Sequence, residues 1–381
     1  MAEAFKHLIN ADTAVHAATH LAANDPGFDP QRFVALATAD LDELSFKARA
    51  LRWADALEAS LPTDFDAAAS VIEASLAPPL ALDAKGEPIG LANALDADGL
   101  CGWALWGTGE FVARRGLQDV PRALRCLHAI TQRFTAEFAI RPFIDRYPDQ
   151  VYPVLKQWTQ DPSPHVRRLV SEGARPRLPW GLRLQALVAN PAPSWPLLQA
   201  LQDDPSAYVR RSVANHLNDI AKDHPDAVAQ WVHQQLQGAS PERRALLKHA
   251  SRSLIKQGHA PTLAVWGVDG GLAGAVRFEV SPEQARVGGT VMLRVALQSS
   301  ARTPQPLVID YAVHHRRANG STAPKVFKGW TLVLGPGEER QLKKAHSLRP
   351  VTTRQLYPGH HRVALHINGQ AVADAAFDLR A

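Results

Sequence analysis

Two acidic residues, Glu137 and Asp219, occur among arginines at helical spacing, a combination that could stabilise a positive charge. Glu137 precedes Arg141 by four residues, so a helix would place both side chains on one face, with Phe138 on the adjacent face. A carboxylate in basic surroundings opposes phosphate binding, and its presence therefore indicates stabilisation of a cationic group. The alternatives are an ordinary surface ion pair between Glu137 and Arg141, and an Asp219 carboxylate that only balances neighbouring arginines.

A second group of residues has the types that bind a nucleic-acid backbone. Arg168 and Arg175 lie on one side of an expected helix, together with Glu172. Trp180 follows in a loop between a proline and a glycine, which is a poor location for a core residue. Guanidinium groups hold phosphates, and an exposed ring packs on a sugar or base. The alternative is that Trp180 caps the hydrophobic end of a helical layer.

These arginines recur because the chain contains a sequence repeat with an offset of 43 residues. The segment Asp161–Glu172 is matched by Asp204–Asn215, and each contains Val-Arg-Arg after Asp-Pro-Ser. The offset aligns Arg211 with Arg168, and it aligns the last residues of the two segments with each other. A period of this length is typical of HEAT-like repeats, in which helix pairs stack into a solenoid with a curved inner surface.

A change in sequence texture near residue 257 predicts two domains. Residues 29–257 have helical periodicity and are interrupted by proline and Asp-Pro. Beyond them, short β-type runs are separated by Gly-Gly, Gly-Pro-Gly and Asn-Gly, which are typical of hairpin turns. The predicted fold is multidomain, an all-α HEAT-like repeat solenoid followed by an all-β immunoglobulin-like sandwich. We place the solenoid at 1–261, a linker at 262–275 and the sandwich at 276–381.

Individual elements follow from the same patterns. One helix is expected from Pro121 to Phe138, upstream of Pro142. In the sandwich, strands are expected at 276–280, 290–297, 307–313, 329–334, 339–345, 362–367 and 371–377.

The charge of the chain is unevenly distributed, although its formal net charge is only +5. Residues 1–100 contain 6 Lys and Arg against 16 Asp and Glu, residues 101–261 contain 21 against 13, and residues 262–381 contain 15 against 8. Clustered positive charge suggests a polyanionic partner, because phosphate contacts release counterions and supply most of the nonspecific affinity for nucleic acids. The alternative is a basic face that is merely solvated.

The composition and motifs also indicate the cellular compartment and exclude some classes of chemistry. The two cysteines form no Cys-x-x-Cys pair, which favours a reducing, cytoplasmic compartment. The first ten residues lack the apolar core of a signal peptide, and no run of about 18 apolar residues could span a membrane. The pairs His314-His315 and His360-His361 would point to opposite faces of a strand, so no metal site is expected. No cofactor-binding motif is found either.

Three segments carry a family resemblance: Glu137–Phe143, His165–Trp180 and Val209–Asp219. The middle segment contains Arg-Pro-Arg-Leu-Pro-Trp, which is no generic feature of HEAT-like repeats. Together they resemble the AlkC/AlkD family of DNA alkylation repair glycosylases, and the AlkC branch in particular. The resemblance extends over residues 1–260, and the sandwich resembles the extra immunoglobulin-like domain of a subset of AlkC proteins.

This resemblance implies a monomeric, monofunctional glycosylase that acts on double-stranded alkylated DNA in base excision repair. The implied substrates are cationic N3-methylated bases, 3-methyladenine first and 3-methylcytosine second, which the family is thought to excise without capturing the base in a flipping pocket. A methylated cationic base leaves as a neutral molecule, so strong general-acid catalysis is unnecessary. A fixed carboxylate could then stabilise the oxocarbenium-like sugar and orient water.

The resemblance and the spacing together nominate the site residues. Glu137 and Asp219 are the catalytic candidates. By resemblance, Trp180 packs on the sugar or base and Arg168 contacts DNA. The other DNA-binding candidates are Phe138, Arg141, Arg175, Arg211 and Asn215.

A different class of function also fits the helical repeat. The chain could be a non-enzymatic HEAT-repeat scaffold that binds nucleic acid or an acidic protein through its arginines. A scaffold does not need inward carboxylates or the Trp180 loop, and release of a methylated base from alkylated DNA would separate the two functions. A nucleic-acid binder without catalysis would show steep salt dependence but no abasic product.

Overall fold

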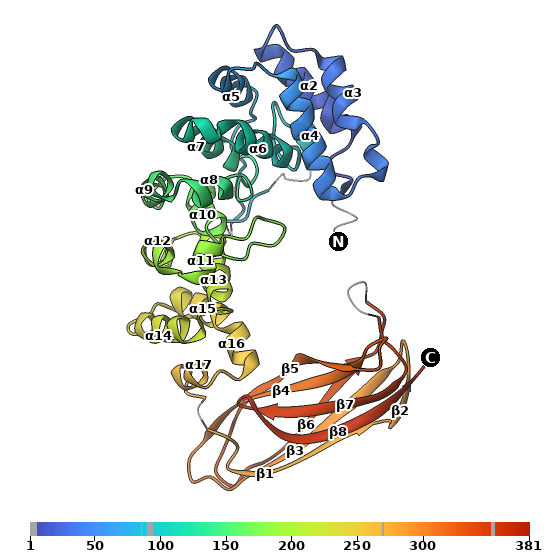
Figure 1. Cartoon of the computed structure of the whole chain (residues 1–381). Coiled ribbons are helices and arrows are strands. Elements are labelled where there is room, and N and C mark those ends of the chain that lie inside the picture. Colours follow the sequence, from blue (N-terminus) through green and yellow to red (C-terminus); the bar gives the residue numbers. More distant parts are fainter. Residues whose placement is uncertain (1–5, 85, 90–93, 269, 352–354) are drawn as a thin grey trace. The chain divides into compact units, whose positions relative to one another are not determined.

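The computed structural model describes residues 6–84, 86–89, 94–268, 270–351 and 355–381. Helices come first along the chain and strands follow (Figure 1). The chain forms two compact units. One is built from the chain up to Asp223 together with Gly238–Ala250, and the other from His224–Gln237 together with the chain from Ser251 onwards.

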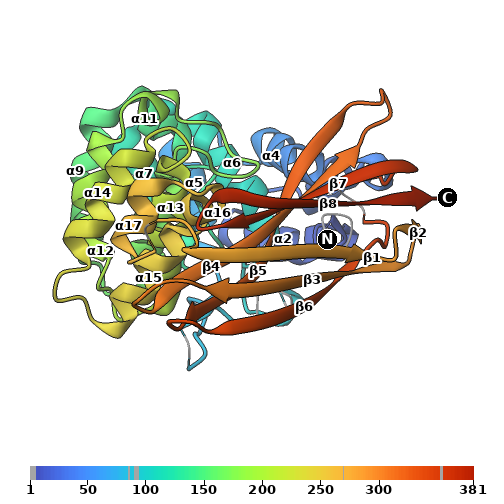
Figure 2. The same cartoon turned by 90° about the horizontal axis from the view of Figure 1, so that it is seen from below.

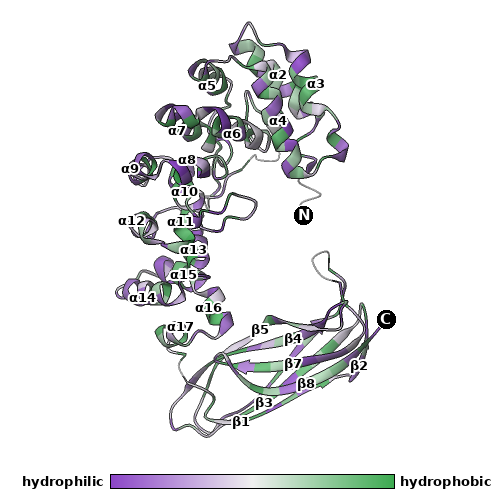
Figure 3. Cartoon of the chain, in the orientation of Figure 1, coloured by the Kyte–Doolittle hydropathy of each residue, from purple (hydrophilic) through white to green (hydrophobic). Residues whose placement is uncertain are grey.

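The helices divide between these units. The first unit contains α2 (Ala11–Asn24), α3 (Pro30–Thr38), α4 (Phe46–Ser60), α5 (Phe65–Ala74), α6 (Ala104–Arg115), α7 (Val120–Thr131), α8 (Arg141–Arg146), α9 (Pro148–Trp158), α10 (Pro164–Gly173), α11 (Gln185–Ala189), α12 (Trp195–Leu201), α13 (Ala207–Ile220) and α15 (Pro241–Ala250), with short 3-10 turns at Leu41–Glu43, Ala94–Asp96, Gly116–Gln118 and Ala192–Ser194. The second unit contains α14 (Pro225–Gln235), α16 (Arg252–Gln257) and α17 (Ala260–Val265). Hydrophilic and hydrophobic residues alternate along the helices, as expected when one face of each is buried (Figure 3).

The compact units do not follow the expected domain boundaries, because three helices group with the strands. Helix α17 also covers the first residues of the expected linker at 262–275. We retain the division into 1–261, 262–275 and 276–381 as a proposal for where the two sequence domains meet.

A close contact between α4 and α6 brings two aromatic rings together. A Cβ on Gly107 would lie 2.6 Å from both Ala50 O and Trp53 Cβ, so only glycine lets the two helices approach this closely. The approach brings Trp106 of α6 beside Phe46 of α4, with ring centroids 5.1 Å apart.

The 43-residue sequence repeat is also a structural repeat. Arg167 Nη1 donates to Asp161 O (2.7 Å) and Pro162 O (3.0 Å), and Arg210 Nη1 donates to Asp204 O (2.5 Å) and Pro205 O (2.9 Å). The first arginine of each Val-Arg-Arg therefore ties its helix to the turn that precedes it. Arg167 also pairs with the Asp204 carboxylate of the next repeat through Nε, at 2.6 Å. These bonds occupy the first arginine of each pair, whereas the second arginine of each pair, Arg168 or Arg211, lies over the ring of Tyr208.

The expected helix from Pro121 to Phe138 is wrong at its carboxyl end. Helix α7 stops at Thr131, and a turn leads to α8, which begins at Arg141. Thr131 Oγ1 accepts Ala136 N (3.4 Å) and Thr135 Oγ1 accepts Glu137 N (3.3 Å). These hydroxyls compete with the helical carbonyls for backbone N–H groups. Glu137 therefore lies in a turn, and it forms no intrahelical pair with Arg141.

A buried histidine joins the repeats and makes their stability depend on pH. His216 Nδ1 donates to Ser171 O (2.9 Å) and Nε2 faces Ser194 Oγ (3.2 Å), so the neutral ring is satisfied. Burial is the largest cause that lowers the pKa of His216, to about 4. The unfolded chain then binds the proton more readily than the folded one, so stability is complete above about pH 6.5 and is lost as pH falls.

We expect protonation of His216 to lower the free energy of unfolding of the first unit by about 3 kcal/mol between pH 6.5 and pH 4. Urea unfolding at a series of pH values measures this change. His216→Gln should flatten the slope relative to the unsubstituted protein. An identical slope in the two proteins would contradict the prediction.

The second unit contains a sandwich of two β-sheets. Its strands are β1 (Gly274–Ser281), β2 (Gln284–Arg286), β3 (Thr290–Ser299), β4 (Gln305–Arg316), β5 (Thr322–Leu334), β6 (Glu339–Ser347), β7 (Gly359–Ile367) and β8 (Gln370–Arg380). One sheet has the order β1-β3-β6 and the other β2-β8-β7-β4-β5 (Figure 2). All pairs are antiparallel except β2 with β8. The predicted all-β sandwich is confirmed, although the short strand β2 and the first half of β5 were not expected.

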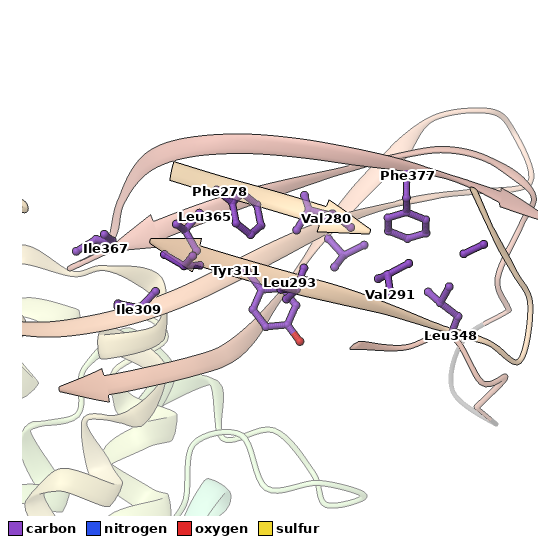
Figure 4. Packing of buried hydrophobic residues seen from close by; sticks show 14 of the residues in the cluster. Phe278, Val280, Val291, Leu293, Ile309, Tyr311, Leu348, Leu365, Ile367 and Phe377 are labelled. Carbon is purple, nitrogen blue, oxygen red and sulfur yellow. The ribbon is translucent and has the colours of Figure 1, made fainter. Parts of the chain in front are cut away.

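Alternating side chains of both sheets form the core of the sandwich (Figure 4). Phe278 and Leu293 come from the smaller sheet, and Ile309, Leu365 and Phe377 come from the larger. The β7–β8 hairpin turns at Asn368-Gly369, where both residues have positive φ angles (49° and 78°), as this turn requires. None of the described helices combines the length and the apolar character that a membrane-spanning segment requires.

Candidate active site

A cavity of about 330 Å³ opens on the helical unit where the turn after α7, one face of α10 and the loop after α10 meet. We call it the site cavity. Its walls combine aromatic rings with charged side chains, and it is lined by Leu80, Pro88, Trp103, Thr131, Phe134, Thr135, Glu137, Phe138, His165, Arg168, Glu172, Arg175, Leu178, Pro179, Trp180 and Tyr208. Glu137, Phe138, Arg168, Arg175 and Trp180 were predicted from sequence, and the structure brings them together here.

Glu137 is held by one of its two oxygens. Its Oε2 accepts Thr135 Oγ1 (2.6 Å) and pairs with Arg168 Nη1 (2.7 Å), and Arg168 Nη1 also donates to Thr135 Oγ1 (2.9 Å). In the hydrogen bonds and ion pairs of the described residues, Glu137 engages Oε2 alone. Glu137 is 8% exposed, and Oε1 is not among the fully buried polar atoms that lack a hydrogen bond, so Oε1 is the carboxylate oxygen available to a ligand.

Glu172 has both oxygens engaged. Its Oε1 accepts Arg175 Nη1 (2.6 Å) and lies 3.6 Å from Arg168 Nη2, and its Oε2 accepts Ser212 Oγ (2.6 Å). Burial opposes ionisation, but Arg168 and Arg175 outweigh it and hold the pKa of Glu172 below its ordinary value. Glu172 was not nominated as a catalytic residue. Its place at the end of the repeated segment, beside two arginines on one helix face, was the signal that could have found it.

Asp219 lies beneath the cavity rather than in its wall. The residue is 1% exposed and is not among the lining residues. Its Oδ2 accepts Arg175 Nε (2.8 Å) and its Oδ1 accepts Lys222 Nζ (2.8 Å). The predicted pair of carboxylates therefore belongs to one network, in which Asp219 anchors an arginine.

Six side chains form a run of alternating charge, which we call the charge chain. In order, it consists of Glu137, Arg168, Glu172, Arg175, Asp219 and Lys222. Each interior carboxylate lies between two cations, so removing one interior member takes a counter-charge from each of its two neighbours. Through Arg168, the charge chain fixes the position of Glu137 on the side away from its Oε1.

The second arginines of the two repeats share a tyrosine. Arg168 lies with its guanidinium carbon 5.0 Å from the centre of the Tyr208 ring, and Arg211 lies at 5.7 Å. Arg211 also forms a bidentate pair with Glu87, in which Nη2 donates to Oε2 at 2.6 Å. No local pattern could have indicated Glu87, because 124 residues separate it from Arg211. Asn215, also predicted, is half-buried on α13 and lies outside the cavity lining.

Trp180 forms the exposed end of a stack of aromatic rings. It is 52% exposed and lies parallel to Trp106, with ring centroids 6.1 Å apart and an angle of 15°. Trp106 in turn stacks on Phe138 at 4.9 Å, and Phe46 meets Trp180 edge-on at 6.1 Å. Trp180 has φ = 65°, a conformation that costs a bulky residue about 1–3 kcal/mol and persists only where the surroundings impose it.

Arg141 does not reach the cavity. Its side chain is fully buried, with Nε donating to Leu182 O (2.6 Å) and Nη1 donating to Gly173 O (2.7 Å). Burial is the largest influence on this guanidinium and lowers its pKa to about 10. Arg141 has no exposed group that could make the expected DNA contact, because its side chain is fully buried.

Fold and site together define a helical-repeat protein whose arginine-containing site cavity also holds carboxylates and an exposed aromatic ring. Comparison with known proteins identifies its family. A family model described as "Uncharacterised protein YhaZ, C-terminal Ig-like domain" matches residues 275–381. The uncharacterized protein YhaZ of Bacillus subtilis (strain 168) is 31% identical over 369 residues, which are 96% of this chain and 96% of that protein.

A solved structure is similar over almost the whole chain. It is the Pseudomonas fluorescens alkylpurine DNA glycosylase AlkC bound to DNA containing an abasic site analog, which is 34% identical, with 99% of each chain covered and a TM-score of 0.85. The chain belongs to the AlkC-type family, in its form with a carboxy-terminal immunoglobulin-like domain.

Proposed function

We propose that this protein is a monofunctional DNA glycosylase of base excision repair that removes cationic N3-methylated bases from double-stranded DNA. The proposed substrates are 3-methyladenine and 3-methylcytosine. The protein would act in the cytoplasm as a monomer, without a cofactor. The observation that carries the proposal is Glu137, whose Oε1 is available in an arginine-lined recess. The similarity to AlkC over 99% of the chain supports it.

The arrangement suits a reaction in which the leaving base carries the positive charge. When the glycosidic bond of a cationic base breaks, the base departs neutral and the charge moves to the sugar. A carboxylate fixed beside the sugar stabilises that charge without reorganisation and can orient the attacking water. The Arg168 contact keeps Glu137 in position, and phosphates on either side of the lesion would meet Arg168 and Arg211.

The recess also supports excision without capture of the base. In the part of the chain that the structure describes, its aromatic wall ends in the half-exposed Trp180, so a lesion could meet Glu137 while remaining close to its duplex. Schiff-base chemistry finds no support, because Lys156 is exposed on α9 and is not among the cavity-lining residues.

The direct test is release of methylated base from alkylated duplex DNA. Purified protein is incubated with methylated DNA, and free bases are separated by chromatography against a protein-free control. We expect 3-methyladenine and 3-methylcytosine to appear with abasic sites but without strand cleavage. A scaffold would instead bind duplex DNA or an acidic protein, with steep salt dependence and release equal to the control.

Trp180 provides a test of the aromatic wall. We expect Trp180→Ala to slow base release about 10- to 100-fold, because the sugar or base loses a stacking interaction that stabilises it by about 1–3 kcal/mol. Trp180→Phe should keep most of the activity. Single-turnover rates with 3-methyladenine duplexes measure both variants, and equal rates for Trp180→Ala and the unsubstituted protein would contradict the packing role.

A further inference from the structure

The loop after α10 needs something to hold it in its unusual conformation. It carries Trp180 with φ = 65° and, two residues further on, Leu182, which is 49% exposed. Its own backbone bonds are few: Gly181 N donates to Leu178 O (3.2 Å) and Leu184 N donates to Pro176 O (3.2 Å). Trp106 and Phe46 support the Trp180 ring, but the positive φ and the exposed Leu182 side chain require a further constraint on the loop backbone.

Arg141 supplies that constraint from the start of α8. Its Nε donates to Leu182 O, on the loop, and its Nη1 donates to Gly173 O, at the last residue of α10. One planar guanidinium therefore joins the two ends of the segment that contains Trp180. A cation is also favoured at Gly173 O, because the carboxyl end of a helix is negative.

The loop packs directly on the Arg141 side chain. A Cβ on Gly181 would lie 3.2 Å from both Arg141 Cδ and Nε. Glycine at this position thus lets the backbone approach the guanidinium closely enough for the Leu182 bond. The three carboxylates of the charge chain attract Arg141 electrostatically, while Arg175 repels it.

We infer that Arg141 is a positioning residue that sets Trp180 over the site cavity, rather than a residue that contacts the ligand. Its effect on base release rests on the proposed function, whereas its effect on Trp180 does not. Lysine cannot replace it, since an ammonium lacks the planar fork that reaches two carbonyls at once.

The test observes Trp180 itself in the full-length chain. The protein is labelled with 5-fluorotryptophan, and the Trp180 resonance is assigned by its absence in Trp180→Phe. We expect Arg141→Gln and Arg141→Lys to shift or broaden this resonance. In single-turnover assays they should lower the maximal rate of base release about 10- to 100-fold while the duplex concentration for half-maximal rate stays nearly constant.

Arg49 provides the matched control. It is 2% exposed, and its Nη1 donates to two backbone carbonyls, Lys6 O (3.1 Å) and Ile9 O (2.8 Å), neither of which belongs to the loop. Arg49→Lys should lower stability as Arg141→Lys does, but leave the Trp180 resonance and the rate unchanged.

A variant on the loop side keeps the inference testable if substitutions of Arg141 do not fold. Gly181→Ala retains the charge but adds a Cβ 3.1 Å from Leu178 Cδ2 and 3.2 Å from Arg141 Cδ and Nε, so it should displace the loop from Arg141 and move the Trp180 resonance too. A Trp180 signal that is unmoved in Arg141→Lys and Gly181→Ala, or moved equally by Arg49→Lys, would overturn the inference. So would a weaker duplex affinity at an unchanged maximal rate. If the unsubstituted protein releases no base, the proposed function fails, and the resonance alone decides the role of Arg141.

Discussion

Glu137→Gln is expected to slow base release about 100- to 1000-fold, the usual effect of removing one fixed electrostatic group, equivalent to about 2.7–4 kcal/mol. The substitution keeps the shape of the side chain and an oxygen for Thr135 and Arg168. What it removes is the negative charge that faces the developing sugar cation. Single-turnover assays with a 3-methyladenine duplex measure the effect.

The same variant should bind the duplex nearly as well as the unsubstituted protein. Glu137 repels phosphates, so loss of its charge removes no attractive contact with the backbone. Glu110, which pairs with Arg114 on α6 at 3.2 Å, provides a matched control: Glu110→Gln should leave base release unchanged. An unchanged rate in Glu137→Gln would remove Glu137 from the mechanism.

The repeat and the domain types could be predicted because their signals are local. The two Val-Arg-Arg segments are offset by 43 residues, and the first arginine of each donates the same hydrogen bond to the aspartate carbonyl before its helix. The alternation of buried and exposed side chains along the sandwich strands is likewise a pattern among neighbouring residues of the sequence. Strand β2, with only three residues, is too short to show such a pattern.

The site could be predicted only in part because its contacts are long-range. Spacing alone paired Glu137 with Arg141, but two threonine hydroxyls end the helix and direct Glu137 to Arg168, in another element. Arg141 could be identified as a basic residue from the sequence, but its burial could not be predicted because it depends on tertiary packing. Trp106 joins the aromatic stack from about 70 residues upstream of Trp180, so no sequence window contains both.

Asp219→Asn is expected to destabilise the first unit by about 3–5 kcal/mol, because it breaks a buried ion pair and leaves Arg175 without one of its two carboxylates. Asp219 is 1% exposed, so water cannot compensate the lost charge. Base release should fall as well, since Arg175 holds Glu172 and Glu172 holds Arg168 beside Glu137. Urea unfolding and single-turnover release measure the two effects.

The comparison between Asp219 and a surface carboxylate separates burial from charge. Asp203 forms an ion pair with Arg243, but its side chain is 49% exposed, so Asp203→Asn should cost less than about 1 kcal/mol. Asp219→Asn should also differ from Glu137→Gln, which lowers activity with little loss of stability. If Asp219→Asn matched Glu137→Gln, with full stability and loss of base release, Asp219 would act on the substrate rather than through Arg175. If it lost neither stability nor activity, the charge chain would not support the site, and Glu137 would have to be positioned by Thr135 and Arg168 alone.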